Sequence, residues 1–165
     1  MMKPAFLLAS LLAAVAGCAS YDGYNLRPGV STEAEVRGTM GTPAMEFRNP
    51  DGSRELVYPR GPIGTQTFFA GLRADGVVSE IRPVLGEGSF NQIRPGQTTR
   101  DDVLRLIGPP GDTMHFALLQ QDSWEYRFRD LWGYIAIFSV NFDNNGVVAS
   151  KFTRRIERGD SKSGR

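Results

Sequence analysis

The stretch IRPGQTTRDDVLRLIGPP, residues 93–110, repeats an earlier stretch of the same chain, LRPGVSTEAEVRGTMGTP, residues 26–43. The register between the two copies continues downstream. Leu56-Val57-Tyr58 aligns with Trp124-Glu125-Tyr126, and Phe68-Phe69-Ala70-Gly71-Leu72 aligns with Phe138-Ser139-Val140-Asn141-Phe142. A unit of this length indicates a duplicated domain rather than a solenoid, whose repeats run to roughly 20–50 residues.

Each copy predicts one short helix that follows a tight Arg-Pro-Gly turn. In the second copy Thr98 or Thr99 can cap the helix, and apolar residues then recur at the i, i+3 and i+4 positions, which places them on one face. A glycine and a proline end the helix. The first copy repeats this pattern with Ser31 or Thr32 as the cap.

Strands are predicted downstream of each helix. Residues 124–129 alternate aromatic and charged side chains, and residues 134–143 carry a second apolar alternation before an Asn-Gly turn. The chain then returns over residues 147–153, and a shorter strand is predicted near residues 113–118. The predicted fold class is α+β, with two tandem repeats that each pack a short helical hairpin on an antiparallel sheet of three to four strands.

The N-terminus predicts an exported lipoprotein. Residues 1–17 combine Lys3 with a short apolar run that ends in small residues, which is typical of a signal peptide and too short to span a membrane. Val15-Ala16-Gly17-Cys18 resembles a bacterial lipobox, so Cys18 is the expected lipid attachment site and residues 18–25 the lipidated linker. The alternative is an ordinary signal peptide with an incidental cysteine.

The charge balance argues against nucleic acid as a partner. Removal of residues 1–17 takes Lys3 from the 19 basic residues and nothing from the 18 acidic ones, which leaves a neutral chain. Nucleic-acid binding calls instead for a basic face. The exception is the C-terminal end, where residues 157–165 are predicted to form a basic, frayed tail.

The repeated pattern resembles the SmpA/OmlA domain, the family of the outer-membrane assembly lipoprotein BamE. The resemblance rests on Ile93-x-x-Gly96-x-Thr98-x4-Val103-x3-Ile107-Gly108-x-Pro110, followed by Trp124-x-Tyr126 and a Phe142…Gly146-Val147 hairpin. The first copy keeps Tyr58 but lacks the tryptophan. The expected division of the chain is repeat 1 over 26–85, a linker over 86–92 and repeat 2 over 93–156.

The resemblance implies a non-enzymatic scaffold for the assembly of β-barrel outer-membrane proteins or for envelope integrity. It implies an outer-membrane location facing the periplasm, with the lipid on Cys18 as anchor and subunits of the barrel-assembly machinery as partners. The tandem arrangement also resembles the secreted β-lactamase inhibitory protein. A periplasmic protein-binding or inhibitor module is therefore the alternative function.

No residue pattern indicates catalysis, a cofactor or a metal. His115 is the only histidine and is read as an ordinary strand residue, since no Cys/His/Asp cluster has metal-ligand spacing. Asp101 and Asp102 are adjacent on the helix and point about 100° apart, and the helix dipole accounts for both. The expectation is that the protein is not an enzyme.

Four residues are candidates for contact with a partner or with lipid headgroups. Trp132 and Tyr134 lie in a predicted turn, where aromatic residues either anchor in the local core or form a hot spot for a partner. Arg94 and Arg158 are expected to face outward, toward acidic partners or anionic phospholipid.

Overall fold

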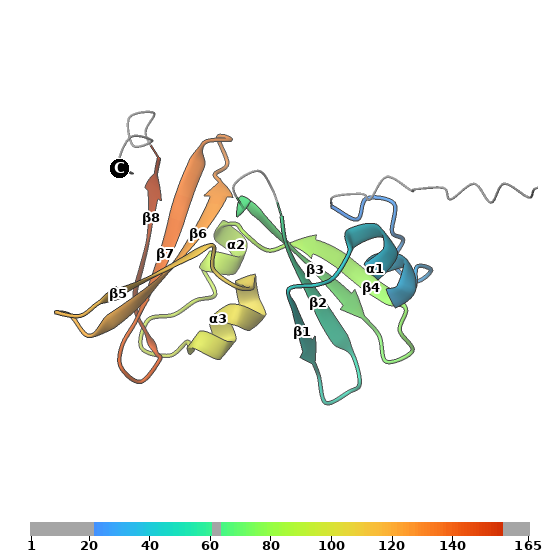
Figure 1. Cartoon of the computed structure of the whole chain (residues 1–165), viewed down its shortest axis with the longest axis horizontal. Helices are drawn as coiled ribbons and strands as arrows, with labels where there is room; N and C mark the ends of the chain where they lie inside the picture. The colour runs from blue at the N-terminus through green and yellow to red at the C-terminus, as the bar shows by residue number, and fades with distance from the viewer. Residues whose placement is uncertain (1–21, 61–63, 157–165) are drawn as a thin grey trace, which may run out of the picture.

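The structure, a computed structural model, describes residues 22–60 and 64–156 and contains two antiparallel four-stranded sheets (Figure 1). Consecutive strands pair in each sheet, so both are meanders. The first sheet consists of β1 (Met45–Arg48), β2 (Arg54–Arg60), β3 (Gln66–Leu72) and β4 (Val78–Pro83), and the second of β5 (Asp112–Phe116), β6 (Gln121–Arg129), β7 (Ile135–Phe142) and β8 (Val148–Arg155). The predicted α+β fold class with two repeated units is confirmed.

The helix directly before each sheet is capped in the same way in both units. Thr32 caps α1 (Glu33–Met40) and Thr99 caps α3 (Arg100–Ile107), each as part of a capping box. The other two predicted cap residues, Ser31 and Thr98, hydrogen-bond to the turn before the helix instead. Ser31 and Thr98 accept the backbone N–H groups of Arg27 and Arg94 at 3.0 and 2.8 Å, which closes the Arg-Pro-Gly turns.

The segment expected as a linker, 86–92, contains a helix of its own, α2 (Glu87–Phe90). Phe90 is buried, and its ring stacks on that of Phe138 with centroids 3.9 Å apart. Residues 86–92 do connect the two sheets, but they also contribute to the core. Among the described residues a pair of helices therefore precedes only the second sheet.

The first core lies between α1 and one face of the first sheet. Val36 and Met40 of α1 are buried there against side chains from three strands, namely Leu56, Tyr58, Phe68, Ala70, Leu72 and Val78. Tyr58 is 1% exposed. This face of the sheet follows the alternation predicted from the sequence, because successive residues of a strand point to opposite faces.

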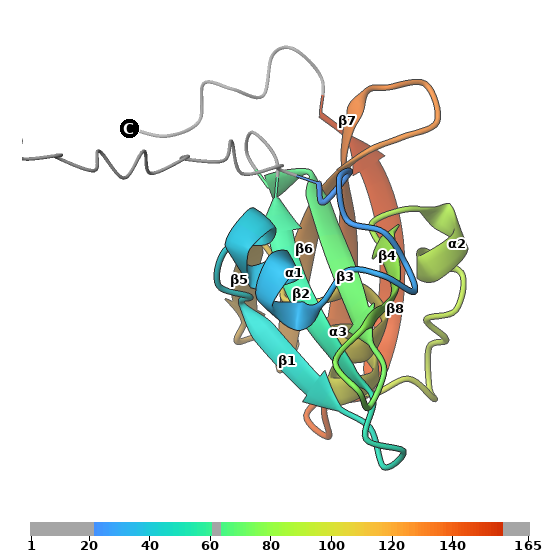
Figure 2. The ribbon, with the colours of Figure 1, turned by 90° about the vertical axis from the view of Figure 1, so that its right-hand side faces the viewer.

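The second core includes residues from both units, and α3 lies between the two sheets (Figures 1 and 2). Val103 and Ile107 of α3 are fully buried, and Leu104 and Leu106 pack against the same cluster. From the first sheet the cluster takes Phe47, Val57 and Phe69, which lie on the face away from α1 and are called here the outer face of the first sheet. Helices therefore cover both faces of that sheet.

The corresponding outer face of the second sheet is polar at the two positions that would have to receive a further helix. Val57 and Phe69, which receive α3, correspond in the repeat to Glu125 and Ser139. Glu125 accepts the Ser139 hydroxyl at 3.5 Å and lies 3.8 Å from the Arg154 guanidinium. A polar outer face is the usual way in which a stack of repeats ends. A helix of a third unit could therefore not pack on the second sheet in the way that α3 packs on the first.

None of the helices in residues 22–60 and 64–156 is long and apolar enough to cross a membrane.

The packing of α3 on the first sheet predicts different outcomes for two equivalent glycines. Gly41 and Gly108 end α1 and α3 with φ of +80° and +79°, but a Cβ at Gly108 would lie 3.0 Å from Val57 Cγ1, whereas one at Gly41 meets nothing within 4 Å. Gly41→Ala should cost only the backbone strain, about 1–2 kcal/mol. Gly108→Ala should cost about 1–3 kcal/mol more through overpacking.

Urea unfolding of the two variants and the wild type measures this difference. Equal losses of unfolding free energy in the two variants would contradict the packing of α3 against the first sheet.

Candidate binding surface

The turn between β6 and β7, residues 130–134, exposes three large apolar side chains. Leu131 is 84% exposed, Trp132 78% and Tyr134 61%. The interpretation that these aromatics anchor in the local core is therefore wrong. Isolated exposed apolar residues are ordinary, but contiguous ones mark an interaction site. Residues 130–134 are called the aromatic turn below.

Asp130 fixes the backbone of the aromatic turn. Its Oδ1 atom accepts the N–H groups of Trp132 and Tyr134 at 2.9 and 3.0 Å, and its own N–H donates to the Tyr134 carbonyl at 2.9 Å. Arg129 donates to the Gly133 carbonyl at 3.1 Å. The turn is thus ordered by its own hydrogen bonds, and it holds its apolar side chains in solvent without a covering layer.

Arg155 at the end of β8 completes the arrangement. Its Nε lies 2.6 Å from Asp130 Oδ2, and its guanidinium carbon lies 5.1 Å from the centre of the Tyr134 ring. Partial desolvation raises the pKa of Asp130, but the hydrogen bonds from Arg155, Tyr134 and Trp132 outweigh it, so the net pKa lies below the ordinary value. The carboxylate of the turn is therefore ionised and paired at neutral pH.

A recess of about 290 Å³ lies beside the aromatic turn. Phe128 and Ala136 form its apolar floor, and Trp132, Arg155 and Glu87 of α2 line its sides. It combines a small apolar floor with two acidic groups, Glu87 and Asp130, and one basic group, Arg155. Such a recess suits a side chain of a partner better than a cofactor, since cofactor sites enclose most of their ligand.

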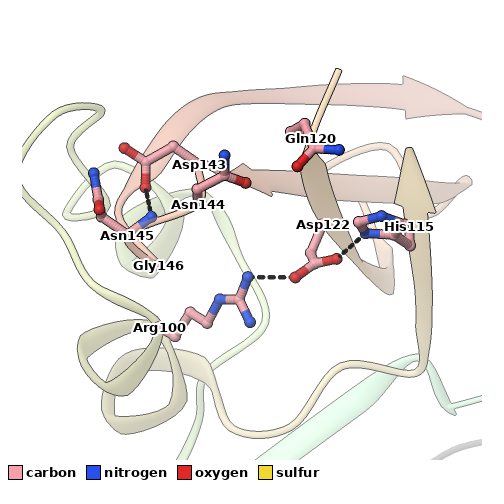
Figure 3. A pocket seen from close by; sticks show the side chains of 8 residues that line it. All are labelled: Arg100, His115, Gln120, Asp122, Asp143, Asn144, Asn145 and Gly146. Carbon is pink, nitrogen blue, oxygen red and sulfur yellow. Dashed lines mark hydrogen bonds and ion pairs between the residues drawn. The ribbon is translucent and has the colours of Figure 1, made fainter. Parts of the chain in front are cut away.

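A second recess, of about 400 Å³, contains the one histidine, His115 (Figure 3). His115 Nδ1 lies 2.7 Å from Asp122 Oδ1, and the other carboxylate oxygen of Asp122 accepts a hydrogen bond from Arg100. The hydrogen bond from His115, and then that from Arg100, lower the pKa of Asp122. The eight residues that line this recess include no hydroxyl or thiol.

The duplicated sequence shows what this cluster does. Arg100 and Asp122 correspond to Glu33 and Arg54 of the first unit, which also form an ion pair, with the charges exchanged. In each unit the first residue of the helix is thus tied to the second strand of the sheet. His115 pairs directly across from Asp122 in the β5–β6 register, so it belongs to the same ion-pair cluster. No group of three or more His, Cys, Asp or Glu in the described residues is placed to hold a metal ion.

The predicted contact residues do not form one site. Trp132 and Tyr134 lie together in the aromatic turn, near the end of β8. Arg94 is exposed in the turn before α3, where Gly96 hydrogen-bonds Val148 at the start of β8, so it lies apart from the aromatics. Cys18 and Arg158 lie outside the described residues.

Sequence reasoning missed three residues of this surface. Leu131, Asp130 and Arg155 join the two aromatics in the structure. A signal for Asp130 was available, because an aspartate that opens a turn commonly accepts the backbone N–H two residues on, as it does here. No sequence signal brings Arg155 to the turn, because that contact depends on the pairing of β7 with β8.

The described residues thus form a two-unit α+β protein that exposes an aromatic turn between β6 and β7. Residues 83–151 match the family model of the outer membrane protein assembly factor BamE domain. The match runs from the end of β4 into β8, and the predicted resemblance is confirmed over this part of the chain. The first unit lies outside the matched residues.

Two other comparisons add no functional information. The chain is similar to the crystal structure of a DUF4309 family protein (YjgB) from Bacillus subtilis subsp. subtilis str. 168, with 17% sequence identity. That similarity covers 81% of this chain and 84% of the other, with a TM-score of 0.31. A comparison with curated proteins gave no match.

The exchanged ion pairs predict a rescue experiment. Arg100→Asp and Asp122→Arg should each lower the melting temperature, because each places like charges side by side. The double variant should recover much of the loss, since the first unit already uses the opposite polarity at these positions.

Thermal unfolding at low and high salt measures the coupling, which should weaken with salt. A double variant no more stable than the worse single variant would show that the two side chains do not interact. For the wild type, the contribution of Asp122 should be present above the ordinary aspartate pKa of about 3.9 and be lost as the pH falls through the lowered value.

Proposed function

We propose that the protein is a lipid-anchored lipoprotein of the outer membrane, facing the periplasm, that acts as a non-enzymatic scaffold in the assembly of β-barrel proteins. The match of residues 83–151 to the BamE domain is the observation that carries this proposal. The described residues support it in two further ways. The His–Asp–Arg cluster is a structural ion-pair cluster, and the aromatic turn exposes three large apolar side chains suited to contact rather than chemistry.

The anchor is the second part of the proposal. The sequence Val15-Ala16-Gly17-Cys18 after a short apolar run supports acylation of Cys18 and cleavage in front of it. The absence of an aspartate after the cysteine, where Ala19 and Ser20 follow, fits transport onward to the outer membrane. Since each buried methylene stabilises membrane binding by about 0.8 kcal/mol, several acyl chains on one cysteine hold a protein at the bilayer.

The packing of α3 restricts where a partner can bind. The outer face of the first sheet is filled by α3, and α1 covers its other face. A partner must therefore contact the second sheet, the turns, or the exposed sides of the helices. This packing also weakens the alternative of an inhibitor module, which needs both sheets to present one concave surface.

The scaffold function is tested by co-purification. The full-length protein, tagged at its C-terminus, is expressed in its own host and isolated from envelopes solubilised in mild detergent. We expect barrel-assembly proteins to be enriched over a control preparation from a tagged lipoprotein of similar size. A preparation that is membrane-bound and folded but contains no barrel-assembly protein would count against this function. Enrichment of a single periplasmic enzyme would favour the inhibitor alternative.

The anchor is tested separately by labelling cells with radioactive palmitate. The wild-type protein should incorporate the label, and Cys18→Ala should abolish it, because Cys18 is the only thiol in the chain. Cys18→Ala should also accumulate as the uncleaved precursor. Label in the Cys18→Ala protein, or none in the wild type, would contradict the lipobox interpretation.

A further inference from the structure

We propose that the aromatic turn is a membrane-docking element, which inserts Leu131, Trp132 and Tyr134 into the headgroup boundary of the bilayer that holds the anchor. This inference rests on the proposed anchoring at Cys18. It assigns to a second, distant part of the chain a role in fixing the orientation of the protein on the membrane surface.

The first argument is the chemistry of the turn. Leucine, tryptophan and tyrosine project from a hydrogen-bonded turn that keeps all three more than half exposed. Tryptophan and tyrosine combine an apolar ring with a polar tip and concentrate at membrane–water interfaces. Because Asp130 already fixes the backbone, little conformational entropy is lost when the side chains are buried in lipid.

The second argument is position. In both views the aromatic turn, the end of β8 and the first described residues lie toward the upper side of the molecule, the turn on the second unit and the first described residues on the first (Figures 1 and 2). Cys18 precedes Asp22 by four residues, which span at most about 14 Å whatever their conformation. An acylated Cys18 thus keeps this side of the protein close to the bilayer.

The third argument is charge. Arg129 and Arg155 flank the turn, and both are attracted to anionic headgroups. The acidic group within the turn, Asp130, is paired with Arg155 and with backbone N–H groups. The turn therefore brings apolar and basic groups toward the membrane surface without an uncompensated carboxylate.

Another turn of the chain also exposes apolar side chains but lies elsewhere on the molecule. The β5–β6 turn also exposes leucines, with Leu118 at 100% and Leu119 at 66%. It lies at the other end of β6 from the aromatic turn and away from the first described residues (Figure 1). Phe116, directly before this turn, is 41% exposed, but the turn has no tryptophan, tyrosine or flanking arginine, so it provides a control.

The main experiment follows the fluorescence of Trp132 in the lipidated protein. The chain has two tryptophans, so Trp124→Phe leaves Trp132 as the only one, and its folding is checked by thermal unfolding. The protein is reconstituted into vesicles of phosphatidylethanolamine and phosphatidylglycerol. We expect the emission to shift to shorter wavelength and to be quenched by phospholipids brominated on their acyl chains. Unchanged emission from protein that floats with the vesicles would overturn the proposal.

A second measurement does not need the lipid anchor. The mature chain carrying Cys18→Ala is mixed with the same vesicles, and its partition is measured by flotation. Leu131→Ser with Tyr134→Ser should lower the partition coefficient about tenfold or more, as expected when the burial of two large apolar side chains is lost. Leu118→Ser with Leu119→Ser should leave it unchanged. An equal loss in both pairs would overturn the proposal.

The outcomes separate this proposal from the proposed function. Vesicle insertion of Trp132 in a protein that takes up no palmitate would remove the anchor and keep the docking element. Palmitate uptake without insertion would do the reverse. A Trp132 emission that responds only to added barrel-assembly proteins, and not to vesicles, would overturn membrane docking in favour of a protein contact.

Discussion

The architecture depends on one helix, α3, packing against two sheets at once. Val103 and Ile107 face the second sheet's own core, while the end of the helix at Gly108 lies against Val57, Thr67 and Phe69 of the first sheet. The Tyr126 hydroxyl donates to the Gly108 carbonyl at 3.1 Å, so the second sheet also holds this point. A Cβ at residue 108 would lie 3.0 to 3.4 Å from these three side chains of the first sheet, closer than ordinary contact, so glycine allows the close approach of the two units.

This contact determines how far the fold could be predicted. The helices, their caps and the strands follow from local patterns, because caps and alternation are decided by neighbours in the chain. The second role of α3 does not, since Leu106 reads from the sequence as part of one apolar stripe with Val103 and Ile107 that faces a single core. The helix α2 could not be predicted either, because it too depends on a tertiary contact. Gly86, Gly88 and Ser89 favour a linker, and it is the burial of Phe90 against Phe138 that fixes them as a helical turn.

The binding surface was predictable only in its chemistry. Trp132 and Tyr134 could be recognised as residues that either fill a core or meet a partner, but their exposure depends on tertiary structure. Phe90 contributes to the core near the turn, where its ring packs on both Phe128 and Phe138 with centroids 4.9 and 3.9 Å away. His115, the one histidine in the sequence, belongs to an ion-pair cluster that ties the helix to the sheet. The first unit makes the equivalent ion pair without a histidine.

Duplication gives this protein a closed stack rather than an extendable one. At one end Arg37 and Thr39 of α1 stand where α3 has Leu104 and Leu106 packed against the core between the units. At the other end Glu125 and Ser139 replace the valine and phenylalanine that receive α3. Neither end repeats the apolar helix-to-sheet contact that joins the two units. A further unit therefore cannot dock by that contact. Contacts with other molecules must then rely on different chemistry, such as the three exposed apolar side chains of the aromatic turn.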